Sequence, residues 1–336
     1  MNKILQLLNE EFVFDYLSKK LLPIYSDFEK IKKIKIIQHK DNIWHETYHV
    51  VFEFRTSFLC KDGKIRTLPI FCSAHSDEPR KNVYDSLRFL WDNDFGKGYL
   101  SIPHPLFFSK YFNATFYRGV SGYDLYYYIC NKEFGVIEDV VTKFAKWLLK
   151  LHNIKTEKNL NPINSKIETV YPGIEHILKR IKNDYPKYGQ VYKKVYGIIN
   201  NNEKAFLSSS KDRWLIHGDA HPENVIKMSP KKIGVIDFTD LCLSDFTRDL
   251  GSFTQQLDYM IMRKIGNQKY ADKIKKIFLD NYFLNSKEKN TKEIQARIKN
   301  YYNWTAMRTA TFFLIKSGPE PNRAAPLIEG VEKNIK

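Results

Sequence analysis

Hydrophobic and polar residues alternate in two different ways along this chain, and the change falls near residue 120. In the first thirty residues, leucine, isoleucine and phenylalanine recur at near-helical spacing, which predicts one or two leading helices. Residues 34–37, 47–54 and 65–72 are then short apolar runs typical of β-strands. The turn Lys61–Lys64 contains Asp-Gly, a strong hairpin signal. The sequence therefore predicts a small antiparallel sheet.

A helix and two more short apolar stretches follow this sheet. Asp77 can cap a helix and Pro79 fits its first turn, so a helix is expected to run as far as Trp91. Two further apolar stretches lie between Ser109 and Val120. These segments complete the strand-rich part of the chain.

Helical periodicity dominates after Gly122, apart from two short apolar runs. Strands first and helices afterwards predict an α+β fold in two lobes. We expect the first lobe to contain residues 1–119 and the second to contain residues 120–336.

Polar side chains follow both of these apolar runs. Trp214–Ile216 leads into the octapeptide HGDAHPEN, which contains Asp219 and Asn224, and the run ending at Ile236 leads into Asp237. Apolar runs of this length bounded by turn residues are typical of buried strands. Three oxygen-bearing side chains are thus expected to emerge from two neighbouring strand ends.

This set of side chains suits a particular chemistry. A few hard oxygen ligands are what magnesium prefers when it keeps its waters and shares its remaining positions with phosphates. A further carboxylate beside the metal can orient a hydroxyl and accept its proton. Aspartate and asparagine are also common in ordinary turns, where they satisfy their own backbone. The joint spacing of the two segments favours phosphoryl transfer.

The two segments resemble the catalytic and metal-binding segments of the aminoglycoside phosphotransferase and choline kinase family, which has the protein kinase fold. Arg118–Leu125 is similar to the family's link between lobes and the helix start that follows it. Phe144–His152 is similar to its helix ending in Leu-His, and Asp249 lies in an Asp-Leu-Gly segment that follows the metal aspartate. The resemblance covers most of the chain from about residue 30.

The resemblance implies roles for individual residues. Asp219 would be the catalytic base, and Asn224 and Asp237 would hold Mg²⁺. His221 would reach the transferred phosphate, although packing within the loop is an equal alternative. The co-substrate would be ATP or GTP, and an adenine edge would pair with the backbone of two residues at the inferred link. Those two residues are Arg118 and Val120.

Three further residues near these segments have expected supporting roles. His217 is expected to be structural, with a metal role as the less favoured alternative. Asp240 is expected to support the site from just past the metal aspartate. Asp249 is expected to tie its helix to the catalytic loop.

The chain departs from the family pattern in its first lobe. Residues 38–47, where a Gly-rich turn is expected, contain no glycine. The third strand has Ser73 about where the family has a lysine that holds the α- and β-phosphates. Asp85 is the nearest candidate for that lysine's acidic partner, and Lys64 and Arg66 lie on the same hairpin. A cation from elsewhere would have to substitute, or the chain would bind ATP poorly.

Composition narrows the remaining classes. The 336 residues include no run of eighteen apolar positions, and the four cysteines are scattered without C-x-x-C spacing. We therefore expect reduced thiols, no membrane span and a cytoplasmic location. The net charge of +16 favours anionic ligands such as ATP. It also raises a nucleic-acid role, but no recognised motif accompanies the lysines, so no nucleic-acid partner is expected.

We expect a small-molecule kinase, with a degenerate kinase fold that binds a nucleotide or metabolite without turnover as the alternative. The acceptor is open among sugars, amino alcohols and nucleoside-like alcohols. Lys and Arg outnumber Asp and Glu beyond residue 255, which disfavours a polycationic antibiotic.

Overall fold

The computed structural model describes residues 2–78, 80–157, 160–169 and 173–335. The chain forms two compact units. Unit 1 joins Met1–Gly122 to Ile226–Thr239, and unit 2 joins Tyr123–Val225 to Asp240–Lys336. The lobe limits 1–119 and 120–336 stay a prediction. These predicted limits do not include the return of Ile226–Thr239 to unit 1.

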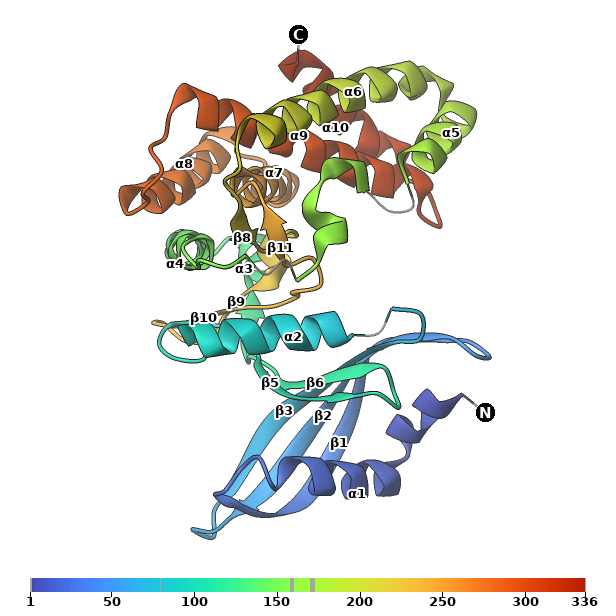
Figure 1. Cartoon of the computed structure of the whole chain (residues 1–336), viewed down its shortest axis with the longest axis vertical. Helices are drawn as coiled ribbons and strands as arrows, with labels where there is room; N and C mark the ends of the chain where they lie inside the picture. Colours follow the sequence, from blue (N-terminus) through green and yellow to red (C-terminus); the bar gives the residue numbers. More distant parts are fainter. Residues whose placement is uncertain (1, 79, 158–159, 170–172, 336) are drawn as a thin grey trace. The chain divides into compact units, whose positions relative to one another are not determined.

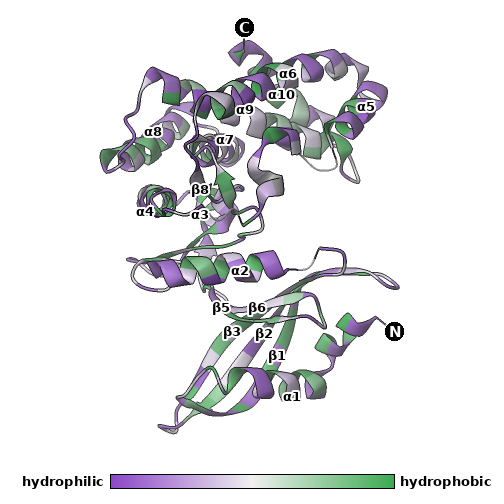
Figure 2. Cartoon of the chain, in the orientation of Figure 1, coloured by the Kyte–Doolittle hydropathy of each residue, from purple (hydrophilic) through white to green (hydrophobic). Residues whose placement is uncertain are grey.

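Unit 1 is built on an antiparallel sheet with the strand order β1-β2-β3-β6-β5. Apolar and polar positions alternate along its strands, as the colour bands of Figure 2 show. This confirms the small antiparallel sheet predicted from the sequence, and the strands extend beyond the predicted runs. The strands are β1 (Phe28–Ile43), β2 (Tyr48–Cys60), β3 (Ile65–His75), β5 (His104–Ser109) and β6 (Ala114–Arg118).

The two leading helices are a 3₁₀ helix η1 (Lys3–Leu8) and the helix α1 (Glu10–Leu21). Their apolar residues share one buried cluster with the apolar side chains of the sheet, so α1 covers one sheet face (Figure 1). The helix α2 (Lys81–Leu90) packs against β5 and β6 and continues into the π-helical turn η2 (Trp91–Phe95). Pro79, predicted in its first turn, lies outside the described residues.

The returning segment of unit 1 holds two short strands, β9 (Val225–Lys227) and β10 (Ile233–Val235). β10 lies parallel to β4 (Leu100–Ser101), with Ile233 opposite Leu100. The backbone N–H of Ile233 also donates to the carbonyl of Tyr99 over 2.9 Å. These backbone bonds explain why the segment belongs to unit 1.

Unit 2 is mainly helical, as predicted. Its strands β8 and β11 pair in antiparallel fashion, with Leu215 opposite Leu243. The helices are α3 (Leu125–Cys130), α4 (Phe134–His152), α5 (Ile174–Asp184), α6 (Pro186–Ser209), α7 (Thr247–Lys264), α8 (Gln268–Leu284), α9 (Lys292–Ile315) and α10 (Pro321–Asn334). The short elements are β7 (Tyr123–Asp124), β8 (Trp214–Ile216), β11 (Cys242–Ser244) and the 3₁₀ turns η3 (Pro162–Ser165), η4 (Ile167–Thr169) and η5 (Pro222–Asn224).

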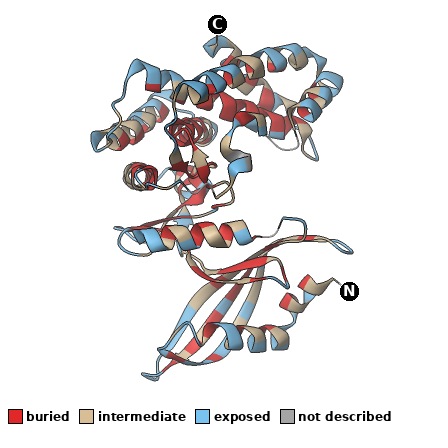
Figure 3. Cartoon of the chain, in the orientation of Figure 1, coloured by how far each residue is buried: buried red, intermediate tan, exposed pale blue. Residues whose placement is uncertain are grey.

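Helix α7 is the most buried helix of unit 2, and most of it is coloured as buried in Figure 3. It packs against α8 and α9. Gly251 makes the close approach to α9 possible, because a Cβ there would lie 2.6 Å from the carbonyl oxygen of Ile298. This helix therefore holds the residues of the candidate site in position.

Candidate active site

The octapeptide predicted to be catalytic follows the buried strand β8. Leu215, Ile216 and His217 are fully buried. Gly218 adopts a φ of +84°, and a Cβ there would lie 2.4 Å from the carbonyl oxygen of Asp240. Only glycine fits this turn without strain, since other residues rarely adopt positive φ. The turn brings the chain from the strand into the loop that contains Asp219.

Asp249, in the first turn of α7, holds this loop in place. Its carboxylate accepts the backbone N–H of His217 over 2.7 Å and that of Gly218 over 2.9 Å. His152, the last residue of α4, lies 3.1 Å from the same carboxylate. Burial raises the pKa of Asp249, but the hydrogen bond and charge of His152, the charge of His217 and the backbone N–H of His217 outweigh it and leave this pKa below its ordinary value. The predicted tie between helix and loop is confirmed.

Asp219 is the only one of the predicted oxygen donors whose carboxylate lines a large cavity of unit 2. Its side chain is 41% exposed, and Nε2 of His221 lies 3.6 Å away. Burial raises the pKa of Asp219, whereas His221, Arg308, His217 and Arg248 lower it by charge, and the balance lies below the ordinary value. Asp219 is therefore ionised at neutral pH, as a group that receives a proton must be.

His221 and Asn224 lie beside Asp219. His221 stands between two carboxylates, with Nδ1 3.7 Å from Glu223. The side-chain amide of the buried Asn224 donates to the backbone carbonyl of Asp219 over 3.0 Å. This bond fixes the orientation of the amide, and its oxygen accepts no hydrogen bond from any residue that the structure describes. The amide oxygen is therefore available to a ligand.

Asp237 belongs to unit 1 and follows β10. It adopts a φ of +65°, which is rare for a residue other than glycine. Its carboxylate is exposed and accepts the hydroxyl of Thr239 over 2.8 Å. Backbone strain of this kind persists where the surrounding structure requires it, and it is concentrated at functional sites. Within unit 1, the charge of Asp237 acts on Lys40 and His49.

Sequence reasoning missed a cluster of basic side chains on the sheet of unit 1. Nζ of Lys40 lies 3.1 Å from Nδ1 of His49, and a guanidinium nitrogen of Arg80 lies 3.1 Å from Nε2 of the same ring. The ring of His75 lies 4.6 Å from that of His49. Burial, followed by the charges of Lys40, Arg80 and His75, lowers the pKa of His49 to about 4. Two cationic side chains, Lys40 and Arg80, are therefore gathered around one neutral imidazole.

This cluster has more hydrogen-bond donors than acceptors. Lysine and arginine only donate, and a neutral imidazole has one acceptor nitrogen, so His49 cannot satisfy both. Arg80 is 7% exposed, and its Nε has no hydrogen-bond partner among the described residues. An oxyanion is the ligand that would relieve this excess of donors.

The residues at which the first lobe departs from the family pattern can be located in unit 1. β1 continues to Ile43, so residues 38–43 are strand, and the turn is closed by the bond from Trp44 N–H to the Thr47 carbonyl. Asp85 pairs with Lys81 at 2.6 Å. Lys64 and Arg66 both face Asp62 at the exposed hairpin turn. None of these three side chains therefore takes part in the cluster around His49.

The two residues predicted at the link lie at the end of unit 1. Arg118 ends β6, between Ile70 of β3 and His104 of β5. The N–H of Gly119 donates to the carbonyl of Pro69 over 2.9 Å. Val120 follows, and its backbone makes no hydrogen bond to the described part of the chain. The backbone of Val120 is therefore open to a ligand.

Comparison with known proteins identifies the family. The family model described as "Phosphotransferase enzyme family" matches residues 68–271, which is more than half of the chain. The chain belongs to this family. No curated protein gives a significant match. The phosphotransferase family was the one suggested by the two motifs, so this resemblance is confirmed.

Solved structures show that this family member has the protein-kinase-like fold. A choline kinase from Cryptosporidium parvum Iowa II is 12% identical with a TM-score of 0.61, over 97% of this chain and 95% of that one. The choline kinase LicA from Streptococcus pneumoniae is 13% identical with a TM-score of 0.59, over 97% and 99%. The aminoglycoside phosphotransferase APH(2'')-IIa, solved with streptomycin and ATP, is 14% identical with a TM-score of 0.58, over 94% of each chain. The predicted α+β kinase-like fold is confirmed.

The described residues also bear on two further expectations from the sequence. No described helix is long and apolar enough to cross a membrane. All four cysteines are free, and three of them are buried. This agrees with the expectation of reduced thiols.

Proposed function

We propose that the chain is a kinase that transfers the γ-phosphate of ATP or GTP to a hydroxyl group of a small molecule. The observation that carries this proposal is the ionised carboxylate of Asp219, which opens into a cavity of about 590 Å³ in unit 2. A hydroxyl bound in this cavity can donate to Asp219. The carboxylate would orient the hydroxyl and accept its proton as the bond to phosphorus forms.

Magnesium fits the oxygen donors that the chain offers. No group of three or more His, Cys, Asp or Glu side chains suited to a metal occurs among the described residues. Asn224 offers an unengaged amide oxygen and Asp237 offers a carboxylate, and hard oxygen donors of this kind are the ligands that Mg²⁺ prefers. These two residues would hold Mg²⁺, which when bound neutralises charge on the phosphate oxygens.

The phosphates of the nucleotide would lie against the basic cluster in unit 1. Lys40 and Arg80 would replace the lysine that Ser73 cannot provide, since both have donors that His49 leaves unsatisfied. The backbone of Arg118 and Val120 would bind the adenine edge. The presence of Asp219, Asn224 and Asp237 in the chain favours a catalytic kinase over the alternative, a degenerate fold that binds a nucleotide or metabolite without turnover.

The test is phosphate transfer from [γ-³²P]ATP, in the presence of Mg²⁺, to a panel of hydroxylated metabolites. The variant Asp219→Asn keeps the shape of the side chain but cannot accept a proton, so the rate should fall at least about 100-fold. Asp280→Asn, on the exposed face of α8, is the matched control and should leave the rate unchanged. Nucleotide binding without any transfer, by a folded wild-type protein, would favour the degenerate alternative.

A further inference from the structure

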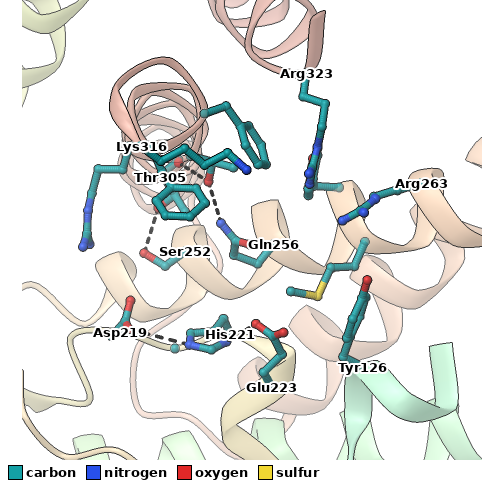
Figure 4. A pocket seen from close by; sticks show the side chains of 17 residues that line it. Tyr126, Asp219, His221, Glu223, Ser252, Gln256, Arg263, Thr305, Lys316 and Arg323 are labelled. Carbon is teal, nitrogen blue, oxygen red and sulfur yellow. Dashed lines mark hydrogen bonds and ion pairs between the residues drawn. The ribbon is translucent and has the colours of Figure 1, made fainter. Parts of the chain in front are cut away.

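The cavity that contains Asp219 lies between two helices of unit 2. Ser252, Gln256, Met260 and Arg263 line it at successive turns of α7. Residues of α9, among them Thr305 and Thr309, line it at helical spacing, and Lys316 follows directly after the end of that helix. Figure 4 shows these side chains directed into the space between the helices.

The contacts between the two helices follow the same order along both of them, which gives the cavity two distinct ends. The hydroxyl of Ser252 bonds to that of Thr305 at 2.9 Å. One turn further along both helices, Gln256 donates to Thr309 at 2.7 Å. A further turn along, the rings of Tyr259 and Phe313 stand 6.0 Å apart between centroids. Each step along α7 is therefore matched by a step along α9.

Asp219 marks one end of this cavity, and Arg263 marks the other. Asp249, one turn before Ser252, binds the loop that contains Asp219. Arg263 lies eleven residues after Ser252, which corresponds to about 16 Å along the helix. Figure 4 shows Asp219 beside Ser252 and Arg263 on the opposite side of the cavity. We call these the catalytic end and the far end.

The far end has an excess of positive charge. Arg263, Lys316 and Arg323 line it. Glu320 pairs with Lys316 and with Arg323. Arg263 makes no hydrogen bond or ion pair with any described residue. Of the two carboxylates that line the cavity, Asp219 lies at the catalytic end, whereas Glu223 lies between the two ends in Figure 4. One guanidinium at the far end is therefore available for an anion.

The aromatic side chains of the cavity do not provide a free cage for a cation. A quaternary ammonium would bind over the faces of such rings. The guanidinium of Arg323 already lies 3.9 Å from the ring centroid of Phe313, and Nζ of Lys316 lies 5.6 Å from that of Phe312. Nζ of Lys264 lies 5.6 Å from the ring centroid of Tyr126. A cationic acceptor would meet charges of its own sign at these rings.

We propose that the acceptor is an elongated hydroxylated molecule that carries an oxyanion, either a carboxylate or a phosphate. Its hydroxyl lies against Asp219, and its oxyanion is bound at the far end by Arg263, assisted by Arg323 and Lys316. Arginine suits this task, because its planar fork matches the oxygens of a carboxylate or phosphate. This inference rests on the proposed kinase function and names the substrate class of the same site.

The reaction balances without further reactants. The acceptor oxygen forms a bond to the γ-phosphorus, and the bond from that phosphorus to the β,γ-bridging oxygen breaks. The bridging oxygen leaves with the electron pair as part of ADP. The hydroxyl proton passes to Asp219 and from there to water. The oxyanion at the far end takes no part in these bonds and serves only to bind and orient.

The first experiment compares matched acceptors in the Mg²⁺–ATP transfer assay. Uridine 5′-monophosphate is compared with uridine, and glucose 6-phosphate is compared with glucose and glucosamine. Choline and kanamycin are included as cationic acceptors. We expect kcat/KM to be at least tenfold higher for an anionic compound than for its neutral or cationic match. A preference for glucosamine, choline or kanamycin would overturn the inference.

The second experiment measures binding without catalysis. Inorganic phosphate is titrated into the full-length protein by calorimetry. Arg263→Gln should weaken phosphate binding at least fivefold, and Arg263→Lys, which keeps the charge, should weaken it less. Lys299→Gln is the matched control, because Lys299 is an exposed cation on α9 that does not line the cavity. Circular dichroism checks that each variant is folded.

The two experiments separate failure of this inference from failure of the proposed function. If no member of the panel is phosphorylated, the measurement of phosphate binding alone tests the proposed oxyanion site. Equal affinities of wild type and Arg263→Gln, or no measurable binding by wild type, would overturn the anionic acceptor even in an active kinase. A clear loss in Arg263→Gln would support the oxyanion site even in a chain without transfer activity.

Discussion

The carboxylate of Asp249 accepts the backbone N–H of His217 while both residues are fully buried. The same carboxylate also holds Gly218 and faces His152. Asp249→Asn would leave a buried donor without its partner, so we expect the free energy of unfolding to fall by about 3 kcal/mol. Urea denaturation measures this, with the exposed Asp280→Asn changing it by less than about 0.5 kcal/mol. An unaltered midpoint in Asp249→Asn would contradict the tie.

Asp249 also predicts how stability depends on pH. Its pKa is lower in the folded chain than the ordinary value near 3.9. A carboxyl group with a lowered pKa stabilises the fold above its unfolded pKa and loses this effect as the pH falls through its folded pKa. Wild type should therefore lose stability from about pH 4 downward more steeply than Asp249→Asn. Parallel pH profiles for the two proteins would argue against this.

Lys40 is predicted to serve in place of the absent strand lysine. A charged contact to a phosphate contributes about 1.5–3 kcal/mol, so Lys40→Met should raise the KM for ATP by about tenfold or more. Lys35→Met is the control, because Lys35 is an exposed lysine of the same strand. Steady-state kinetics at varied ATP concentration distinguish the two variants. Equal KM values would show that the cluster does not bind the phosphates.

His49 should report the arrival of the nucleotide. Its pKa lies at about 4 because of burial and the charges of Lys40, Arg80 and His75. Phosphate oxygens near these cations would offset their repulsion, so the pKa of His49 should rise when ATP binds. NMR titration of the imidazole protons, assigned with His49→Asn, measures the shift. A pKa that stays the same at saturating ATP would place the nucleotide elsewhere.

Gly218 is predicted to tolerate no side chain. Gly218→Ala combines a left-handed φ with a Cβ 2.4 Å from the Asp240 carbonyl, so it should lower the free energy of unfolding by at least about 2 kcal/mol. Gly197→Ala is the matched control. Gly197 lies in α6 with open space around it, and the substitution should stabilise the helix by about 0.5–1 kcal/mol. Thermal unfolding of both variants tests whether the signs are opposite.

The parts of the fold that depend on local pattern could be predicted from the sequence. The octapeptide after Trp214–Ile216 follows a strand, and the Asp-Gly turn at Lys61–Lys64 forms the hairpin, closed by the bond from Cys60 N–H to the Lys64 carbonyl. Helix α4 ends at His152, as the Leu-His resemblance implied. Each of these features is determined by residues within a few positions of each other.

The basic cluster could not be predicted in this way. Lys40 lies on β1 and His49 on β2, and the register of these strands places Lys40 near His49. Arg80, the residue before α2, reaches the same ring from a distant part of the chain. A sequence pattern does not specify register between strands that lie far apart. The only local signal was the glycine-free stretch 38–47, which contains Lys40 and which indicated a departure without identifying its replacement.

The return of Ile226–Thr239 to unit 1 has a consequence for dissecting the protein. The polypeptide passes between the two units after Gly122, after Val225 and again after Thr239. A truncated chain that starts at Tyr123 would retain β10 but lack its partner strand β4. Two halves that each fold alone would therefore need two changes. The segment Ile226–Thr239 would have to be fused to the first half, and Val225 would have to be joined to Asp240 in the second half.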